Sequence, residues 1–318
     1  MKIALVLFGW LLAAAALAQD FPTRPLRVIT PSPPRGGFDL VARVIADKMA
    51  EALGQSVVVE NRAGAGTLVG TELAAKAAPD GYTLLVAGTP NLALNAGLYR
   101  ALPYDPQRDF TPIGLATAFS YTLIARKDLA PSTLRELVDL ARANPDKLTY
   151  ASGGNGTGQH VAGAVLAHLA GLRMVHVPYK GAQAAYQDLL AGRIDLFFDN
   201  TSTARTHVEA GSVKAYAVSS RARQAVHPNI PTVVETGVVD FDIESWFGYF
   251  APAKTPTPVI ERLRGAFARA LDHPDVVARF EKSGARVLKL SPAEAEALVT
   301  RDLDKWSRLI RAAGLKAD

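Results

Sequence analysis

The fold is decided by the stretch Thr30-Pro-Ser-Pro-Pro-Arg-Gly-Gly-Phe-Asp39, which joins the apolar segment Leu26–Ile29 to an amphipathic one. Its three prolines cannot donate to a sheet ladder, so the strand predicted over Leu26–Ile29 must end there. Gly36 and Gly37 permit a tight turn and let a ligand approach main-chain N–H groups closely. A helix is predicted next, because apolar residues recur at helical spacing at Val41, Val44, Ile45, Met49 and Leu53.

A strand, a glycine turn and a helix N-terminus together form a potential anion site, since unpaired N–H groups and the helix dipole point at the turn. The alternative is a tight connection between strand and helix, with Asp39 as the N-cap residue. For a single pair of glycines, that structural interpretation is the commoner one. The anion-site interpretation gains weight because the chain contains a second loop of the same kind.

The second loop is Ser152-Gly-Gly-Asn-Gly-Thr-Gly158, between a strand predicted over Leu148–Ala151 and a helix predicted over Gln159–Ala170. Asn155 and Thr157 have short side chains that can donate to a carboxylate, and the helix N-terminus adds roughly half an elementary positive charge. Open α/β sheets bind ligands beyond the carboxyl ends of their strands, where both loops lie. If two lobes face each other, one loop from each could hold an anion between them.

Strands and helices alternate along the rest of the chain, which predicts an α/β fold with largely parallel sheets covered by helices on both faces. The other predicted strands are Val57–Glu60, Thr83–Ala87, Met174–Val177, Ile194–Phe198, Lys214–Ser219, Ser245–Phe250 and Arg286–Leu290, with apolar stretches at Ile113–Ala116 and Tyr121–Ala125. The other predicted helices are Val69–Ala77, Leu134–Asn144, Ala182–Ala191, Ser202–Ala210, Pro256–Leu271, Pro274–Lys282 and a long C-terminal helix that a capping box opens at Ser291.

Residues 1–18 are predicted to be a signal peptide. Met1-Lys2 is a short basic start, Ile3–Ala16 an apolar core, and Ala16-Leu17-Ala18 a cleavage site of the A-x-A type. The apolar run is too short for a comfortable membrane span. We therefore expect an exported, periplasmic mature protein that begins near Gln19.

The composition indicates a globular protein, with 49% hydrophobic and 20% charged residues in a length that suits two domains. Cysteine is absent, which excludes a disulfide framework and thiolate chemistry. The formal net charge of +5 becomes +4 without Lys2, a mild positive field that favours small anions. Lysines and arginines do not cluster with stacking aromatics, so a nucleic-acid partner is not expected.

Other motifs for chemistry fail on spacing. Gly64-x-Gly66-x-x-x-Gly70 resembles a dinucleotide fingerprint, but its last gap is one residue too long, which favours a structural loop. The six histidines do not fall at metal-ligand spacings. No cofactor, metal or catalytic residue is therefore predicted. Asp199-Asn200, at the end of a predicted strand, could act as an acceptor and donor pair for a ligand or could form a turn.

A series of longer motifs runs in order through essentially the whole mature chain: Phe21-Pro-Thr-Arg-Pro-Leu-Arg-Val-Ile29, Pro33-Pro-x-Gly-Gly-x-Asp39, Val57-Val-Val-Glu-Asn-Arg-x-Gly-Ala-Gly66, Ala78-Pro-Asp-Gly-Tyr-Thr-Leu-Leu85, Leu102-Pro-Tyr-Asp-Pro106, Tyr150-Ala-Ser-Gly-Gly-Asn-Gly-Thr157, His176-Val-Pro-Tyr-Lys-Gly181, Phe198-Asp-Asn200 and Ser245-Trp-Phe-Gly248. These motifs resemble those of the Bug/TctC-type extracytoplasmic solute receptors of tripartite tricarboxylate transporters.

The resemblance implies a two-lobed periplasmic-binding-protein fold of the Venus-flytrap, type II-like kind, with two crossover strands. It also implies a carboxylate-bearing ligand in the cleft and membrane transporter subunits as partners. We expect a monomeric receptor that captures a mono-, di- or aromatic carboxylate without transforming it. The ligand-binding residues that the resemblance implies, or that stand beside them in the first loop, are Ser32, Arg35, Gly36, Gly37, Phe38, Thr89, Asn91, Gly154, Asn155, Gly156, Thr157 and Asp199.

The first loop departs from the family pattern at Ser32, Arg35 and Phe38, where the family usually has an aromatic residue, a glycine and a small residue. The Arg35 guanidinium could make a bidentate contact with a carboxylate or could point to solvent. The predicted lobes are residues 19–120 with 244–318, and residues 121–243, hinged near Phe119–Thr122 and Trp246–Phe250.

Two other functions remain open. One is an exported hydrolase or isomerase on the same scaffold, which would need a nucleophile and a base together in the cleft, and the sequence offers no motif for such a pair. The other is a sensory receptor domain that feeds a signalling partner instead of a transporter. The sequence does not distinguish this second alternative from a transport receptor.

Overall fold

The computed structural model describes residues 21–34 and 36–316, so the predicted signal peptide and Arg35 lie outside the described residues. The strands are β1 (Leu26–Thr30), β2 (Val57–Asn61), β3 (Thr83–Gly88), β4 (Phe110–Arg126), β5 (Thr149–Ser152), β6 (Val175–Pro178), β7 (Leu196–Asn200), β8 (Val213–Val218), β9 (Glu244–Pro252) and β10 (Arg286–Val287). The α-helices are α2 (Gly37–Leu53), α3 (Leu68–Ala75), α4 (Asn95–Leu98), α5 (Leu134–Ala143), α6 (Gly158–Ala170), α7 (Ala182–Leu190), α8 (Thr201–Glu209), α9 (Thr257–Asp272), α10 (Pro274–Lys282) and α11 (Pro292–Ala312). A 3-10 turn, η1 (Ala65–Thr67), and a π-helix, η2 (Thr89–Leu94), complete the elements.

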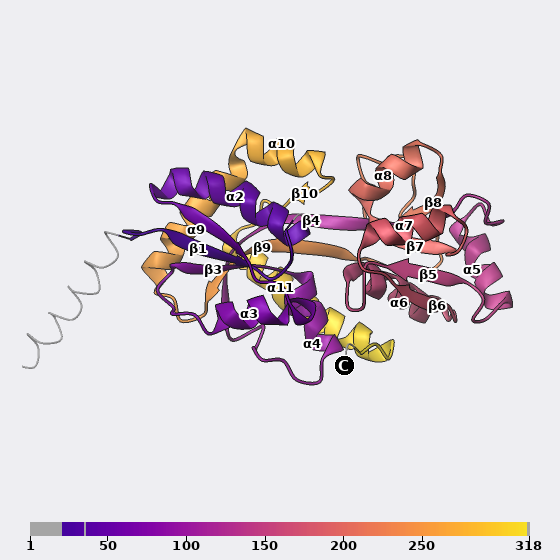
Figure 1. Cartoon of the computed structure of the whole chain (residues 1–318), viewed down its shortest axis with the longest axis horizontal. Helices are drawn as coiled ribbons and strands as arrows, with labels where there is room; N and C mark the ends of the chain where they lie inside the picture. Colours follow the sequence, from indigo (N-terminus) through magenta and orange to yellow (C-terminus); the bar gives the residue numbers. More distant parts are fainter. Residues whose placement is uncertain (1–20, 35, 317–318) are drawn as a thin grey trace, which may run out of the picture.

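The strands form two groups that share β4. In one group the order is β2-β1-β3-β9-β4, and in the other it is β4-β7-β5-β6, with β8 also pairing with β4. Strand β1 is parallel to β2 and β3, and β5 is parallel to β6 and β7. Strands β4 and β9 are antiparallel to each other and run between the two groups of elements (Figure 1). The chain therefore has the predicted two-lobed α/β fold with two crossover strands, while the predicted lobe boundaries and hinge residues stay a prediction.

Strand β4 is longer than the sequence suggests. The two apolar stretches expected at Ile113–Ala116 and Tyr121–Ala125 belong to one strand of 17 residues. Polar residues between them hide its continuity, yet they are buried: Ser120 is 2% exposed and its hydroxyl lies 2.9 Å from the Thr201 hydroxyl of α8. A buried polar side chain with a partner inside the protein is tolerated in a central strand.

Helix α2 buries its predicted apolar face in a core that it shares with residues of β1, β3 and α9. Its buried residues include Val41, Val44, Ile45, Met49 and Leu53, which confirms the predicted helix and its orientation. The alternative with Asp39 as N-cap is wrong, because the N-cap is Gly36 and has no capping side chain. Gly36 has φ −92°, a backbone conformation open to any residue, so this glycine provides space and not an unusual turn.

The C-terminal helix α11 begins as predicted, with a capping box between Ser291 and Glu294. Its buried residues include Val299, Leu303, Trp306 and Ile310. The Trp246 indole of β9 donates to Asp302 of this helix at 2.9 Å, which ties α11 to a crossover strand. Over residues 21–34 and 36–316, every helix is too short or too polar to cross a lipid bilayer.

The close packing of β4 against β9 yields a stability prediction. A Cβ at Gly248 would overlap the carbonyl oxygen of Gly114 and come within 2.8 Å of Leu115 Cα. Gly248→Ala should therefore lower the free energy of unfolding by about 1–3 kcal/mol, the usual cost of overpacking. Urea unfolding followed by tryptophan fluorescence measures this.

The matched control is Gly265→Ala in the middle of α9, where the nearest atom to a new Cβ is 3.9 Å away. Helix propensity predicts that this change raises the unfolding free energy by about 0.5–1 kcal/mol. Equal effects of the two substitutions would contradict the claim that the crossover strands meet at Gly248.

Candidate functional site

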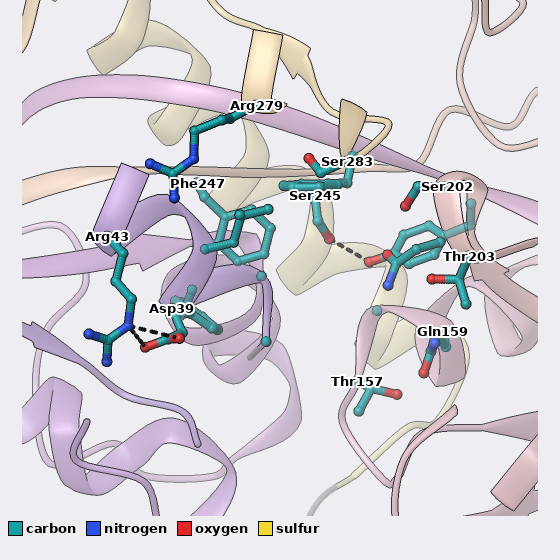
Figure 2. Close-up of a pocket in the computed structure, with 18 residues that line it drawn as sticks. Asp39, Arg43, Thr157, Gln159, Ser202, Thr203, Ser245, Phe247, Arg279 and Ser283 are labelled. Carbon is teal, nitrogen blue, oxygen red and sulfur yellow. Dashed lines mark hydrogen bonds and ion pairs between the residues drawn. The ribbon is translucent and has the colours of Figure 1, made fainter. Parts of the chain in front are cut away.

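A cavity of about 610 Å³ receives residues from both lobes and from both crossover strands (Figure 2). It is lined by the first residues of α2, α6 and α8, by the second half of β4, by the first half of β9, and by Arg279 of α10 with the C-cap Ser283. The site thus combines three helix N-termini with the strands that join the lobes.

The first of these helices is α2. The backbone N–H groups of Gly37 and Phe38 have no acceptor in the described part of the chain, as expected for an uncapped first turn. The Asp39 carboxylate accepts from Arg43 Nε at 3.0 and 3.2 Å and from Asn61 Nδ2 at 2.9 Å. This helix therefore begins with an acid of its own that is paired with a cation.

Helix α6 begins at the second glycine loop. Its N-cap Thr157 accepts from the His160 N–H at 3.3 Å and donates to the Gly154 carbonyl at 2.8 Å. Gln159, only 8% exposed, accepts from the Gly153 N–H at 2.7 Å and donates to Asp199 at 2.6 Å. An amide carries two N–H donors, and the second N–H of Gln159 has no acceptor among the described residues.

Asp199 lies one layer behind the cavity. It is fully buried, and besides Gln159 it accepts from the Tyr186 hydroxyl at 2.9 Å. Burial raises the pKa of Asp199 to about 6, and the bonds from Tyr186, the Asn200 N–H and Gln159 oppose that rise. The carboxyl group therefore fixes the orientation of Gln159 and does not itself line the cavity.

The third helix, α8, follows directly from β7. Asn200, Ser202 and Thr203 line the cavity, and their side chains have no hydrogen-bond partner within residues 21–34 and 36–316. The first turns of α6 and α8 contain no acidic residue, unlike that of α2. Figure 2 shows Ser202 and Thr203 on the same side of the cavity as Thr157 and Gln159. Free donors and two positive helix ends therefore gather on that side.

One face of the crossover pair forms the floor of the cavity. Phe119 and Tyr121 are two residues apart on β4, and Ser245 and Phe247 are two apart on β9, so each pair points to one face of the sheet. The Tyr121 and Ser245 hydroxyls lie 2.7 Å apart, so one of them donates to the other. The accepting hydroxyl keeps its own proton, which it can donate to a ligand. Burial raises the pKa of Tyr121 from its ordinary value of 10 to about 12, so this hydroxyl stays protonated well above neutral pH. Gly158 is required beside it, because a Cβ there would overlap the Tyr121 oxygen.

Three phenylalanines form the remaining wall. The Phe247 ring meets Phe38 at 4.9 Å between centroids and Phe119 at 5.5 Å, in both cases nearly edge to face. All three rings line the cavity, and each is less than 10% exposed. The wall is apolar and closely packed.

The structure brings Gly36, Gly37, Phe38 and Thr157 to the cavity, but not the other described residues that the sequence predicts for the site. Thr89 is buried and accepts from the Trp246 N–H at 3.0 Å, and Asn91 is buried between Gly88 and Thr71. The residues outside the lining are Ser32, Thr89, Asn91, Gly154, Asn155, Gly156 and Asp199. Their part in ligand binding stays a prediction, and that of Arg35 concerns a residue outside the described ones.

Sequence reasoning missed several lining residues. Ser245 and Phe247 lie within a recognised motif, so that motif could have identified them. Gln159 directly follows the second glycine loop and could have been included with it. Nothing in the sequence marks Ser202 and Thr203 beyond their place after Asp199-Asn200, because their approach to the cavity depends on the arrangement of the lobes.

The described residues do not form a recognisable metal site. Within the described ranges, no group of three or more histidine, aspartate or glutamate side chains is arranged to hold a metal ion. The cavity offers three helix N-termini, uncharged donors, an aromatic wall and the charged side chains of Asp39, Arg43 and Arg279. Such an arrangement can bind an anion.

The protein resembles a well-populated group of solute receptors. The profile described as "Tripartite tricarboxylate transporter family receptor" matches residues 41–315. The relative called "UPF0065 protein in tcbD-tcbE intergenic region", from Pseudomonas sp. strain P51, is 39% identical over 91% of this chain and 86% of its own length.

Two solved structures share the fold over nearly their whole length. The periplasmic binding protein BugD has a TM-score of 0.79 and 36% identity, covering 93% of this chain and 99% of BugD. MatC from Rhodopseudomonas palustris with bound malate has a TM-score of 0.80 and 34% identity, covering 91% of this chain and 100% of MatC. The resemblance noted in the sequence is confirmed, and the chain belongs to the tripartite tricarboxylate transporter receptor family.

Proposed function

We propose that this protein is a periplasmic receptor that captures a small carboxylate-bearing organic acid for a tripartite tricarboxylate-type transporter. The observation that carries the proposal is the meeting of three helix N-termini on one cavity that both lobes line. Helix N-termini favour anions through their free N–H groups and dipoles. The related receptor MatC, whose structure contains malate, supports a carboxylate as the bound group.

Binding without reaction agrees with the chemistry of the described residues. The family consists of receptors, and the cavity lining contains no histidine beside a nucleophile. A serine–histidine pair does exist, with Ser152 Oγ 2.7 Å from His176 Nε2. However, Ser152 is fully buried outside the lining and also contacts the Gly154 carbonyl. We infer that this pair supports the second glycine loop and has no catalytic role.

Capture would proceed by closure of the lobes around the acid. Residues 19–120 with 244–318 would form one lobe and residues 121–243 the other, with β4 and β9 as the connections. An acid that contacts α2 from one lobe and α6 and α8 from the other binds the closed form better, so it shifts the population toward closure. The transporter would recognise the closed, monomeric receptor after export by the signal peptide.

Ligand binding is tested by thermal unfolding of residues 19–318 with mono-, di- and aromatic carboxylates, each beside its neutral amide. An acid at a hundredfold excess over its Kd should stabilise the protein by about 2.7 kcal/mol, and the amides should not. Stabilisation by no acid, or equally by acids and amides, would contradict the proposal.

The matched variants are Gly36→Val and Gly37→Val. A Cβ at Gly37 would lie 3.4 Å from Phe247 Cζ, and one at Gly36 would lie 3.7 Å from Ser32 Oγ, so the Cβ atom itself makes only ordinary contacts at each position. The added methyl groups would obstruct ligand approach to the turn. Each variant should lose at least about tenfold in affinity, or about 1.4 kcal/mol. The control variant Gly265→Ala should bind the acid with wild-type affinity. Unchanged affinity in both valine variants would show that the first loop is not part of the site.

Asp199 generates a pH prediction. Its pKa of about 6 in the folded protein exceeds the ordinary value of 3.8, because burial penalises the charged form. The folded state therefore holds this proton more tightly, and the stability that Asp199 contributes is fully present below about pH 4 and is lost as the pH rises through about 6. Relative to Asp199→Asn, the wild type should lose up to about 3 kcal/mol of unfolding free energy between about pH 4 and pH 7.

Urea unfolding of both proteins across this pH range measures the difference. Tyr186 and Gln159 can still hydrogen-bond an asparagine, so the variant should fold. A difference that is constant with pH would show that Asp199 keeps an ordinary pKa.

A further inference from the structure

A buried acid lies directly behind one wall of the cavity. The Asp199 carboxylate is fully buried, and it accepts from Gln159 Nε2 at 2.6 Å and from the Tyr186 hydroxyl at 2.9 Å. Within residues 21–34 and 36–316 its charge is held by hydrogen bonds, and no cationic side chain contributes to its pKa. The carboxylate therefore has donors around it but no opposite charge to balance it.

Gln159 connects this acid to the cavity. Its side-chain oxygen accepts from the Gly153 N–H at 2.7 Å, so the amide cannot turn over without losing that bond. One amide N–H points at Asp199, and the other has no acceptor in the described structure and is available at the cavity wall (Figure 2). A ligand carboxylate that accepts this second N–H is separated from Asp199 by a single NH₂ group.

The ligand and Asp199 would draw on the same two helix N-termini. Asp199 directly precedes the N-cap of α8 and accepts from the Asn200 N–H, and Gln159 lies in the first turn of α6. Like charges so close in a buried site disfavour each other, and one of the two groups then takes up a proton. Burial already raises the pKa of Asp199 to about 6, above that of an ordinary carboxylic acid, so Asp199 accepts the proton more readily than the ligand does.

The hydrogen bonds around Asp199 permit the protonated form. The Tyr186 hydroxyl can either donate or accept, so it can reverse and accept from a protonated Asp199. Gln159 continues to donate to the other oxygen and keeps its place at the wall. An asparagine side chain has the same pattern, with an oxygen toward Gln159 and an N–H toward Tyr186.

The other ionisable groups around Asp199 are already settled. Titratable side chains on the elements packed against β7 are Tyr121 of β4, Tyr150 of β5, His160 of α6, Tyr186 of α7 and His207 of α8, whose ring stacks on that of Tyr186. Burial raises the pKa of each of these tyrosines and lowers that of His160, so these four groups are uncharged at neutral pH. Charged side chains on the same elements are paired elsewhere, as Arg126 with Asp195, Arg193 with Asp188, and Arg205 with Glu209.

We propose that capture of an organic acid at the N-termini of α6 and α8 is coupled to the uptake of one proton by Asp199, which acts on the ligand through Gln159. The proton comes from the solvent and returns to it when the acid leaves. The inference rests on the proposed function and adds a charge-balancing residue to it. It leaves the α2 side open to a second carboxylate, where the Gly37 N–H, Arg43 and Arg279 line the cavity.

The test is calorimetric titration of residues 19–318 with malate, adipate and benzoate at pH 7, each in two buffers of different ionisation enthalpy. The difference between the buffers gives the number of protons bound with each acid, and the wild type should take up about half a proton or more. These acids are largely ionised above pH 6. Because the bound state must then draw a proton from an increasingly dilute supply, the Kd should rise at least about tenfold from pH 6 to pH 8.5.

The decisive variant is Asp199→Asn, which keeps the hydrogen bonds of the protonated acid but cannot titrate. It should bind without proton uptake, with a Kd independent of pH, and at pH 8.5 at least about tenfold more tightly than the wild type. A residue that merely held Gln159 in place would give equal or weaker binding. Asp188→Asn is the matched control, because Asp188 is paired with Arg193 outside the cavity, and it should behave as the wild type.

Carbon-13 NMR of the aspartate carboxyl groups, with and without malate at pH 7, reports the same proton in the wild type. It keeps the inference testable if Asp199→Asn fails to fold.

The outcomes separate this inference from the proposed function. Acid binding without proton uptake and with a constant Kd would overturn the coupling and leave the carboxylate receptor intact. Uptake that persists in Asp199→Asn would assign the proton to another group, such as His160, and the inference would again be wrong. Binding of none of these acids, nor of any other carboxylate in the thermal screen, would count against the proposed function itself, and the inference would fall with it.

Discussion

The antiparallel pairing of β4 with β9 is the interaction on which the rest of the structure depends. These strands belong to the sheet of one lobe and run to the other, and Gly248 lets them pack closely at Gly114. Their pairing places Phe119 opposite Ser245, and the two-residue period of each strand then points Tyr121 and Phe247 to the same face. The floor of the cavity and the connection between the lobes are therefore the same structural feature, so a ligand that contacts the floor also contacts the strands about which the lobes would move.

Charge is distributed unevenly around that floor. Helix α2 begins with its own acid, Asp39, which Arg43 balances, whereas the first turns of α6 and α8 carry only uncharged donors toward the cavity. Buried Asp199 adds no charge to the lining and instead orients Gln159. Several oriented N–H dipoles can act together on an anion at low cost in reorganisation, and Arg43 and Arg279 also line the cavity.

Local patterns predicted the elements well. The apolar face of α2, the capping box at Ser291 and the glycine turns before α2 and α6 depend on residues close in sequence, and periodicity and capping chemistry report on such residues directly. The continuous strand β4 was not evident, because the buried polar residue Ser120 gains its partner, Thr201, from an element 81 residues away. Contacts between distant elements also explain why some site residues were not predicted. Ser202 and Thr203 reach the cavity only through the packing of the lobes. Asp199 was expected at the ligand but lies one layer behind Gln159.

The central claim is that an organic acid is held at helix N-termini from both lobes. Hydrogen exchange of backbone amides, with and without saturating benzoate or malate, tests it most directly, since the first amides of a helix exchange quickly unless an acceptor protects them. The account predicts slower exchange at residues 37–38, 158–159 and 202–203 together, with no change in α5, which lies outside the lining. Protection confined to one lobe, or absent from all three helix starts in the presence of a bound acid, would contradict it.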